Sequence, residues 1–377
     1  MYVGLNGGNY RPATADETWK RRFGDCKAKT ALLLALLRTL EVPAEATLVN
    51  AEDGDGIDDR LPSPSVFNHV LVRATLGEKS YWLDGTLRGN LSLANLPPQR
   101  FRWALPLRAK DATLVAVPLE APVEPQLIDV VDIDATAGIE RPARIKVQRV
   151  VRGAEVPEYR ANLSNLPLDG VDRVLKTYWR ESGGWVLENQ SVAWRYDEGH
   201  EALILSMTGE GKPDWETTSD DTPRLALPGA GFTPPSELKR PKEQDQAAPW
   251  TTEFPIFHCW ATTVRLPDPG ASAWSYRSAP VDRKLGGIAY WRTAALRGNV
   301  MRTVMSKRFY LPEISAAEAA EVNAAIPGFD NKKSIVYQTP ATQVRTPPSA
   351  APMPPFGDET NWLESSALCS SPKRPSL

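Results

Sequence analysis

The longest apolar stretch of the chain lies over residues 26–42 and predicts a helix that opens on a cysteine. Neither glycine nor proline interrupts it before Pro43, and leucine or alanine lies on nearly every side of a helix drawn over it. A helix that is apolar all round is expected to be buried. Asp25 directly precedes the stretch, and its carboxylate can cap the N–H groups of the first turn. We therefore expect a central, buried helix with Cys26 in its first turn, where unpaired N–H groups and the macrodipole favour a thiolate.

A second pattern, rich in β-branched and aromatic residues, predicts a β-hairpin over residues 66–84. Gly77 and Glu78 separate its two strand-like halves and suit a two-residue turn. With that turn, Asp84 on the second strand lies diagonal to His69 on the first. Diagonal neighbours are about 7–8 Å apart at the backbone, within reach of an imidazole and a carboxylate. A register shifted by one residue would place the two on opposite faces of the hairpin.

A cysteine at a helix start, followed by a histidine and an aspartate on adjacent strands, suits an activated nucleophile. Cys26 would attack, His69 would accept and return the proton, and Asp84 would fix the tautomer of the ring. The residues alone leave two other interpretations open. A single cysteine beside an apolar helix is often inert core. The three side chains could also bind zinc, but a set without a fourth ligand is unusual for that metal, so we expect no metal and no other cofactor.

Three short motifs carry a resemblance to a known family. Gly24-Asp-Cys26, Phe67-Asn-His69 and Tyr81-Trp-Leu-Asp84 resemble, in type, order and spacing, the motifs of the transglutaminase-like cysteine enzyme superfamily. The resemblance is closest to a bacterial branch in which a papain-like core is flanked by β-sandwich domains of unknown function. The Tyr2-Val-Gly-Leu opening and the Leu61-Pro-Ser-Pro segment also resemble that branch.

The resemblance implies an α+β fold, with a papain/transglutaminase-like core of one central helix on an antiparallel sheet, followed by β-sandwich-type domains. It implies that Cys26 forms a thioester from an amide bond of a protein or peptide, with His69 as general base and acid and Asp84 as the orienting residue. Water as acceptor would make the chain a protease or amidase, and an amine would make it a transglutaminase. The residues do not choose between them. The competing hypothesis is a non-catalytic adaptor that retains the core as a peptide-binding scaffold.

Composition along the chain predicts its division into parts. The resemblance covers residues 1–118 firmly, and the Pro-rich residues 119–125 read as a linker. Residues 126–338 are β-rich and suit one or two sandwich-type domains. Residues 339–377 are rich in proline and poor in large apolar side chains, so we expect a disordered tail. Within the β-rich part, the pattern predicts strands at 128–133, 143–151, 186–196, 202–207, 257–266, 287–296 and 300–310, and helices after Asp169 and Ser315. Residues 209–250 are predicted to form a long loop or a domain junction.

The overall charge and hydropathy exclude several classes of function. The 377 residues carry a net charge of −2, with 42% hydrophobic and 24% charged residues, which are ordinary globular values. They give no electrostatic case for nucleic acid or an anionic membrane. No stretch reaches the roughly 18 uninterrupted apolar residues of a transmembrane helix.

The cysteines and the start of the chain bear on its compartment. Cys26, Cys259 and Cys369 are too few and too scattered for a disulfide framework or a zinc ribbon. His258 neighbours Cys259, so on a strand the two face opposite ways, and we expect both to be structural. No secretory signal opens the chain. Members of the resembling branch are often exported, so we suspect a periplasmic location and a chain shortened by its signal and first sandwich domain.

Overall fold

The protein combines α-helices and β-strands in several sheets and is mostly β. The computed structural model describes residues 12–52, 56–87, 92–93, 96, 99–108, 110–153, 155–219, 222–329, 332–340, 342, 360–364 and 366–370. The motif at residues 2–5 lies outside them. Contacts divide the chain into two compact units, Met1–Glu120 and Ala121–Leu377, at the Pro-rich segment. No helix among the described residues is long and apolar enough to span a membrane.

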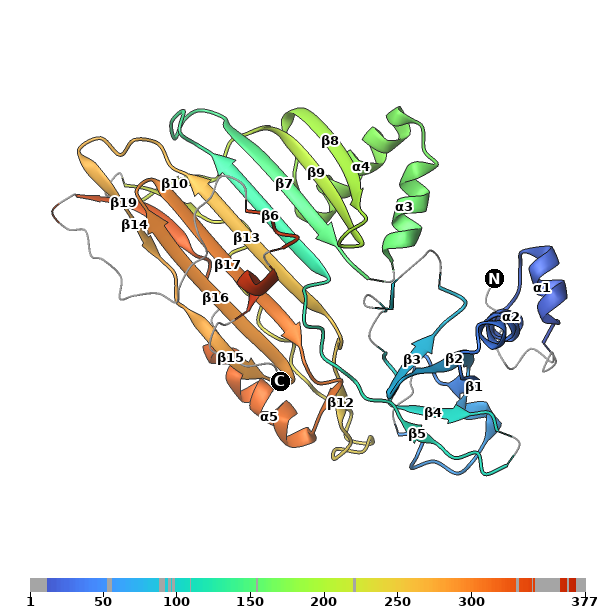
Figure 1. Ribbon diagram of the computed structural model, residues 1–377. Coiled ribbons are helices and arrows are strands. Elements are labelled where there is room, and N and C mark those ends of the chain that lie inside the picture. Colours follow the sequence, from blue (N-terminus) through green and yellow to red (C-terminus); the bar gives the residue numbers. More distant parts are fainter. Residues whose placement is uncertain are drawn as a thin grey trace. The chain divides into compact units, whose positions relative to one another are not determined.

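The first unit is a helix pair on an antiparallel sheet. Its elements are α1 (Ala15–Arg21), α2 (Cys26–Thr39), β1 (Ala44–Val49), the 3-10 turn η1 (Pro64–Val66), β2 (His69–Leu76), β3 (Lys79–Leu83), β4 (Trp103–Pro106) and β5 (Val115–Ala116). The strand order is β3-β2-β1-β4-β5, with every neighbouring pair antiparallel. Helix α2 packs against α1 and across β1 and β2 (Figure 1). Its N-terminus is thereby held beside the strand that begins at His69.

Local sequence explains how α1 and α2 begin and meet. Thr14 and Glu17 form a capping box at the start of α1. Asp25 caps α2 by accepting from the Ala28 N–H at 2.9 Å. Between the helices, a Cβ added to Gly24 would lie 2.8 Å from the Cβ of Ala28 and 3.0 Å from Cγ2 of Thr18. Because side chains cannot approach so closely, only glycine lets the two helices meet here.

The prediction that α2 is buried is wrong for most of its length. Only Lys27, Ala28 and Thr30 are buried, whereas Leu36 is 46% exposed and Leu40, at its C-terminal end, is 70% exposed. The helix rests by one side on the sheet and α1. A helix placed on one layer leaves its far side uncovered by that layer, even where the side chains are apolar.

The second unit contains most of the strands. Its elements are β6 (Leu127–Asp134), β7 (Ala143–Val151), α3 (Val156–Ser164), α4 (Leu168–Gly183), β8 (Glu188–Asp197), β9 (Ala202–Gly211), β10 (Trp215–Thr217), β11 (Pro223–Ala226), β12 (Trp250–Thr251), β13 (Phe257–Arg265), β14 (Ser272–Arg277), β15 (Val281–Leu285), β16 (Ile288–Arg297), β17 (Val300–Phe309), β18 (Glu313–Ile314), α5 (Ala316–Ala325), η3 (Ile326–Gly328), β19 (Ile335–Pro340) and η5 (Ser366–Cys369). The seven strands predicted in this part all form, and helices lie close to the two predicted positions. Helix α3 and the short strands β10, β11, β12, β14, β15, β18 and β19 were not predicted.

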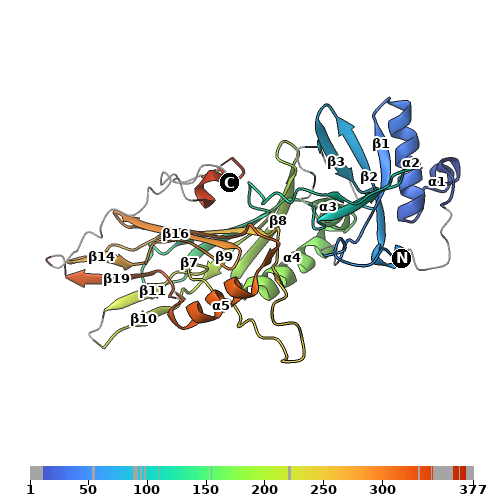
Figure 2. The same cartoon turned by 90° about the horizontal axis from the view of Figure 1, so that it is seen from below.

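Two sheets of this unit share one core. The larger has the order β15-β16-β17-β13-β6-β7-β9-β8, and the smaller has the order β10-β11-β19-β14. Leu225, Trp274 and Val336 of the smaller sheet pack in one cluster with the larger sheet and with Leu175 and Trp179 of α4. Figure 2 shows the smaller sheet and α4 on the same side of the larger one.

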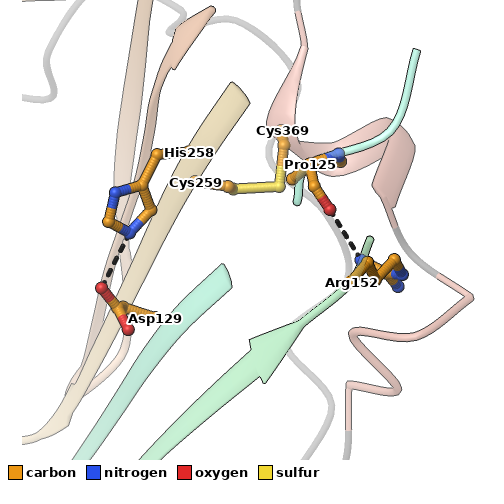
Figure 3. The surroundings of a disulfide bond; sticks show 6 residues. All are labelled: Pro125, Asp129, Arg152, His258, Cys259 and Cys369. Carbon is orange, nitrogen blue, oxygen red and sulfur yellow. Dashed lines mark hydrogen bonds and ion pairs between the residues drawn. A yellow bond between two sulfur atoms is a disulfide. The ribbon is translucent and has the colours of Figure 1, made fainter. Parts of the chain in front are cut away.

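Described residues between 360 and 370 cover the opposite face of the larger sheet, whereas a disordered tail was expected over 339–377; most of the remaining residues of that range lie outside the described ones. Trp362, Leu363 and Cys369 are buried against apolar residues of β6, β7, β9, β13, β16 and β17. Cys369 forms a disulfide with Cys259 of β13 (Figure 3). This single bond was not expected, because the cysteine count bears on disulfide frameworks that replace a core and not on one bond added to a core. Arg152 also holds the tail by donating to the Leu363 carbonyl at 3.1 Å.

His258 and Cys259 leave β13 in opposite directions, as strand alternation predicts (Figure 3). His258 Nε2 bonds Asp129 Oδ2 at 2.8 Å on the face away from the disulfide. Asp129 also accepts two bonds from Arg149, which in turn donates to the hydroxyl of Tyr178 on α4. Each charge of this half-buried set therefore has a partner, and the set joins three strands to α4.

Removing the disulfide is expected to destabilise the second unit. The bond closes a loop of 110 residues, and loss of a native disulfide typically costs about 2–5 kcal/mol. In Cys259→Ala/Cys369→Ala, urea unfolding followed by circular dichroism should show a loss in this range. Reduction of the native chain should reproduce the loss, and Cys26→Ala should not. An unchanged unfolding midpoint would show that the disulfide does not stabilise the second unit.

Candidate functional site

Cys26 is the first residue of α2 and is half-buried. Its N–H precedes the first bond within the helix, which runs from Lys29 N to Asp25 O at 3.0 Å. Such first-turn N–H groups favour a nearby negative charge. The helix is tied to β2 by Thr30, whose hydroxyl donates to the Val70 carbonyl at 3.3 Å. The thiol is thus fixed beside the strand that carries the candidate histidine.

His69 opens β2, and its ring is buried, the residue being only 5% exposed. The hairpin has the predicted register: Leu76 pairs with Lys79 across a two-residue turn. Before the strand, Asn68 accepts from the Ala51 N–H at 2.8 Å and donates to the Asn50 side chain at 3.0 Å. These bonds fix the chain immediately before His69 to the end of β1.

Asp84 follows the last residue of β3 and points at the histidine. Its Oδ2 lies 2.9 Å from His69 Nε2. Its Oδ1 accepts from the hydroxyl of Thr86 at 2.6 Å and from the Thr86 N–H at 2.8 Å. The distance between the ring nitrogen and the carboxylate is that of a hydrogen bond, and both carboxylate oxygens are occupied.

The second ring nitrogen, His69 Nδ1, is buried and has no partner of standard hydrogen-bond geometry among the described residues. The thiol that interacts with the ring is that of Cys26. A looser sulfur contact is common in a free enzyme. The His69 ring is thus bonded to Asp84 on one side, and the Cys26 thiol interacts with the same ring.

The electrostatics of the three groups are mutually reinforcing. The interaction with His69 lowers the pKa of the Cys26 thiol and outweighs partial burial, which raises it. Burial of the His69 ring lowers its pKa, but bonds to Asp84 and Cys26 outweigh burial and raise the pKa to about 9. Burial also raises the pKa of Asp84, yet the bonds from His69 and Thr86 hold it below its usual value. Each interaction therefore favours the charged form of its partner, the thiolate of Cys26 and the imidazolium of His69.

Two nearby residues were not singled out in the sequence. Lys27 is buried, forms an ion pair with Asp25 at 3.0 Å, and contributes to the lowered pKa of Cys26. Thr86 bonds Asp84 as described above. The spacing of Thr86 is a local signal that could have found it, because a threonine two residues after an aspartate often donates to that carboxylate. No such rule identifies Lys27.

The described residues contain no group of three or more His, Cys, Asp or Glu side chains placed to hold a metal ion. The site instead contains one half-buried thiol and one carboxylate, both of which interact with one buried imidazole. This set can exchange a proton between sulfur and ring nitrogen while the carboxylate holds the ring.

Comparisons with known proteins give one distant structural likeness. No family model matches the chain, and no curated protein matches it. A crystal structure described as a putative protease from Parabacteroides distasonis is similar in structure, with a TM-score of 0.43 and 13% sequence identity, over 90% of this chain and 48% of that one. The chain thus spans about half the length of the protein that it resembles.

Proposed function

We propose that the chain is a transglutaminase-like cysteine enzyme that acts on amide bonds of a protein or peptide. In this proposal Cys26 is the nucleophile, His69 the general base and acid, and Asp84 the residue that orients His69. The first unit is its papain-like core, and the second is a β-sandwich-type region.

One observation carries the proposal: the His69 ring bonds the Asp84 carboxylate at 2.9 Å and also interacts with the Cys26 thiol. A structural histidine needs no thiol at its second nitrogen, and an inert core cysteine needs no imidazole. The lowered pKa of Cys26 at a helix start adds the activation that a thiol nucleophile requires.

The chemical step follows from the protonation states. The Cys26 thiolate attacks the carbonyl carbon, and the negative charge moves to the carbonyl oxygen. The Cys26 backbone N–H at the start of α2 supports that oxygen. His69 then gives its proton to the amide nitrogen, and the C–N bond breaks. The amine leaves, and the acyl group remains on the Cys26 sulfur as a thioester. Water or a second amine attacks the thioester, His69 takes its proton, and the thiolate is released.

An oxidising compartment fits this proposal. Disulfides persist in secreted and periplasmic proteins and are rare in the cytosol, and Cys259 and Cys369 are joined by one. We therefore retain the expectation of an extracytoplasmic location.

The first test measures thiol reactivity and needs no substrate. In the unreduced chain Cys26 is the one thiol among three cysteines, so iodoacetamide uptake reports on it alone. Only about 0.3% of an unperturbed thiol of pKa about 8.5 is ionised at pH 6. Native Cys26 should react at pH 6 many times faster than the same thiol in the urea-unfolded chain. Its rate should change again near pH 9, where His69 loses its proton.

A native alkylation rate equal to that of the unfolded chain at pH 6 would refute the proposal and favour the adaptor hypothesis. The acceptor is found separately, by following amine release from casein and incorporation of a fluorescent primary amine into casein. Release alone identifies a hydrolase, and incorporation identifies a transferase.

A further inference from the structure

Asp84 divides its two carboxylate oxygens between different partners. Oδ2 faces His69 Nε2, while Oδ1 accepts both the hydroxyl and the backbone N–H of Thr86 at 2.6 and 2.8 Å. A carboxylate on a short side chain can turn about its terminal bond with little hindrance. Three hydrogen bonds in fixed directions leave it one orientation, in which Oδ2 points at the ring.

The turn that carries Thr86 is itself fixed to the helix of the nucleophile. A Cβ added to Gly85 would lie 3.3 Å from the Cβ of Lys29 and 3.6 Å from its carbonyl oxygen. The backbone of residue 85 therefore packs closely on the first turn of α2. This contact sets the position of the Thr86 donors relative to Cys26.

We propose that Thr86 is a positioning residue of the site, whose hydroxyl holds the Asp84 carboxylate in the orientation that directs Oδ2 at His69 Nε2. The inference rests on the proposed function. Thr86 touches neither the thiol nor the ring in the described contacts and acts through Asp84. The Thr86 hydroxyl donates its hydrogen bond to Asp84 Oδ1, so Oδ2 remains available to accept from His69 Nε2.

The electrostatic consequence reaches the thiol in two steps. The bonds from Thr86 help to keep Asp84 ionised against the effect of burial. An ionised and oriented Asp84 keeps the imidazolium, and the imidazolium lowers the pKa of Cys26. Loss of the hydroxyl should therefore appear as slower alkylation at low pH, which a purely structural role would not cause.

The test compares Thr86→Val with Thr86→Ser in the full, unreduced chain. At pH 6 the Cys26 alkylation rate should fall about threefold to tenfold in Thr86→Val, a tenfold fall being one pKa unit of thiolate formation. The backbone N–H still donates to Asp84, so the loss is partial. Thr86→Ser keeps the hydroxyl and should react as the native chain does. At pH 10 all rates should converge, and the neighbouring residues Asp25 and Lys27 are present in every variant compared.

The chain offers a matched control in Thr136. Its hydroxyl and N–H donate to Asp134 Oδ1 at 2.6 and 3.2 Å, in the same Asp-x-Thr spacing, in the second unit. Thr136→Val should leave the alkylation of Cys26 unchanged.

Each outcome has one meaning. A native thiol without enhanced reactivity at pH 6 would overturn both the proposed function and this inference. An enhanced native thiol with an unaltered Thr86→Val would overturn only the inference. Equal losses in Thr86→Val and Thr86→Ser would also overturn it, since packing and not the hydroxyl would be responsible. If Thr86→Val reacts at the rate of the unfolded chain, because it does not fold, the Cys26 alkylation rate of Thr86→Ala at pH 6 is compared with those of Thr86→Ser and the native chain instead.

Discussion

The Cys26→Ala variant is expected to lose amide-bond turnover by at least about 10⁴-fold while keeping its free energy of unfolding within about 1 kcal/mol of the native value. Without sulfur no thioester can form, and His69 and Asp84 cannot supply a nucleophile. The stability change is small because Cys26 is half-buried and sits at the edge of a helix, not in a filled core. Amine release from casein and urea unfolding measure the two effects.

Two controls separate chemistry from folding. Cys26→Ser nearly keeps the size of the side chain but should be as inactive as Cys26→Ala, because His69 and Asp84 do not ionise a serine hydroxyl. Cys259→Ala/Cys369→Ala removes two cysteines outside the candidate site and should keep turnover per folded molecule. Turnover that survives in Cys26→Ala would assign the activity to another group and refute the role of the thiol.

The geometry of the candidate site was accessible from sequence because short-range rules determine it. A two-residue turn fixes the hairpin register, and strand parity then puts Asp84 on the face of His69. An aspartate before an apolar run caps a helix, which places Cys26 in the first turn. The proximity of Cys26 to His69 came from the family resemblance, since no local rule brings residues 26 and 69 together.

Features that depend on distant parts of the chain were missed. The disulfide joins cysteines 110 residues apart, and their pairing follows from the packing of Trp362 and Leu363 on the larger sheet. Strand β19 pairs with β11 and β14, which come much earlier in the chain. These strands are short, and short polar segments carry little periodicity.

The error on α2 has a different cause. Periodicity reports which sides of a helix are apolar, and here nearly all are. It does not report how many layers the fold supplies to cover them. Most contacts of α2 with other elements are with α1, β1 and β2, and these leave Leu36 and Leu40 exposed.

Replacing Asp84 with asparagine should cut turnover by about 10³–10⁴-fold while preserving the fold. The Thr86 donors explain why. The backbone N–H and the hydroxyl of Thr86 both point at the position of Oδ1. The amide oxygen of asparagine therefore takes that place, and its NH₂ group faces His69 Nε2. Nε2 must then accept, and Nδ1 carries the proton toward Cys26. Nδ1 can no longer act as the base, and Cys26 remains a thiol. Alkylation at pH 6 should fall toward the rate of the unfolded chain.

The double variant Asp84→Asn/Thr86→Val tests whether this orientation is the cause. Without the Thr86 hydroxyl, one of the two donors that hold the amide is lost, and the wrong orientation is less favoured. The double variant should therefore lose no more turnover than Asp84→Asn alone, although Thr86→Val by itself is slower than the native chain. Losses that multiply would mean that Thr86 and Asp84 act on the thiol independently. Native-like alkylation in Asp84→Asn would remove Asp84 from the site altogether.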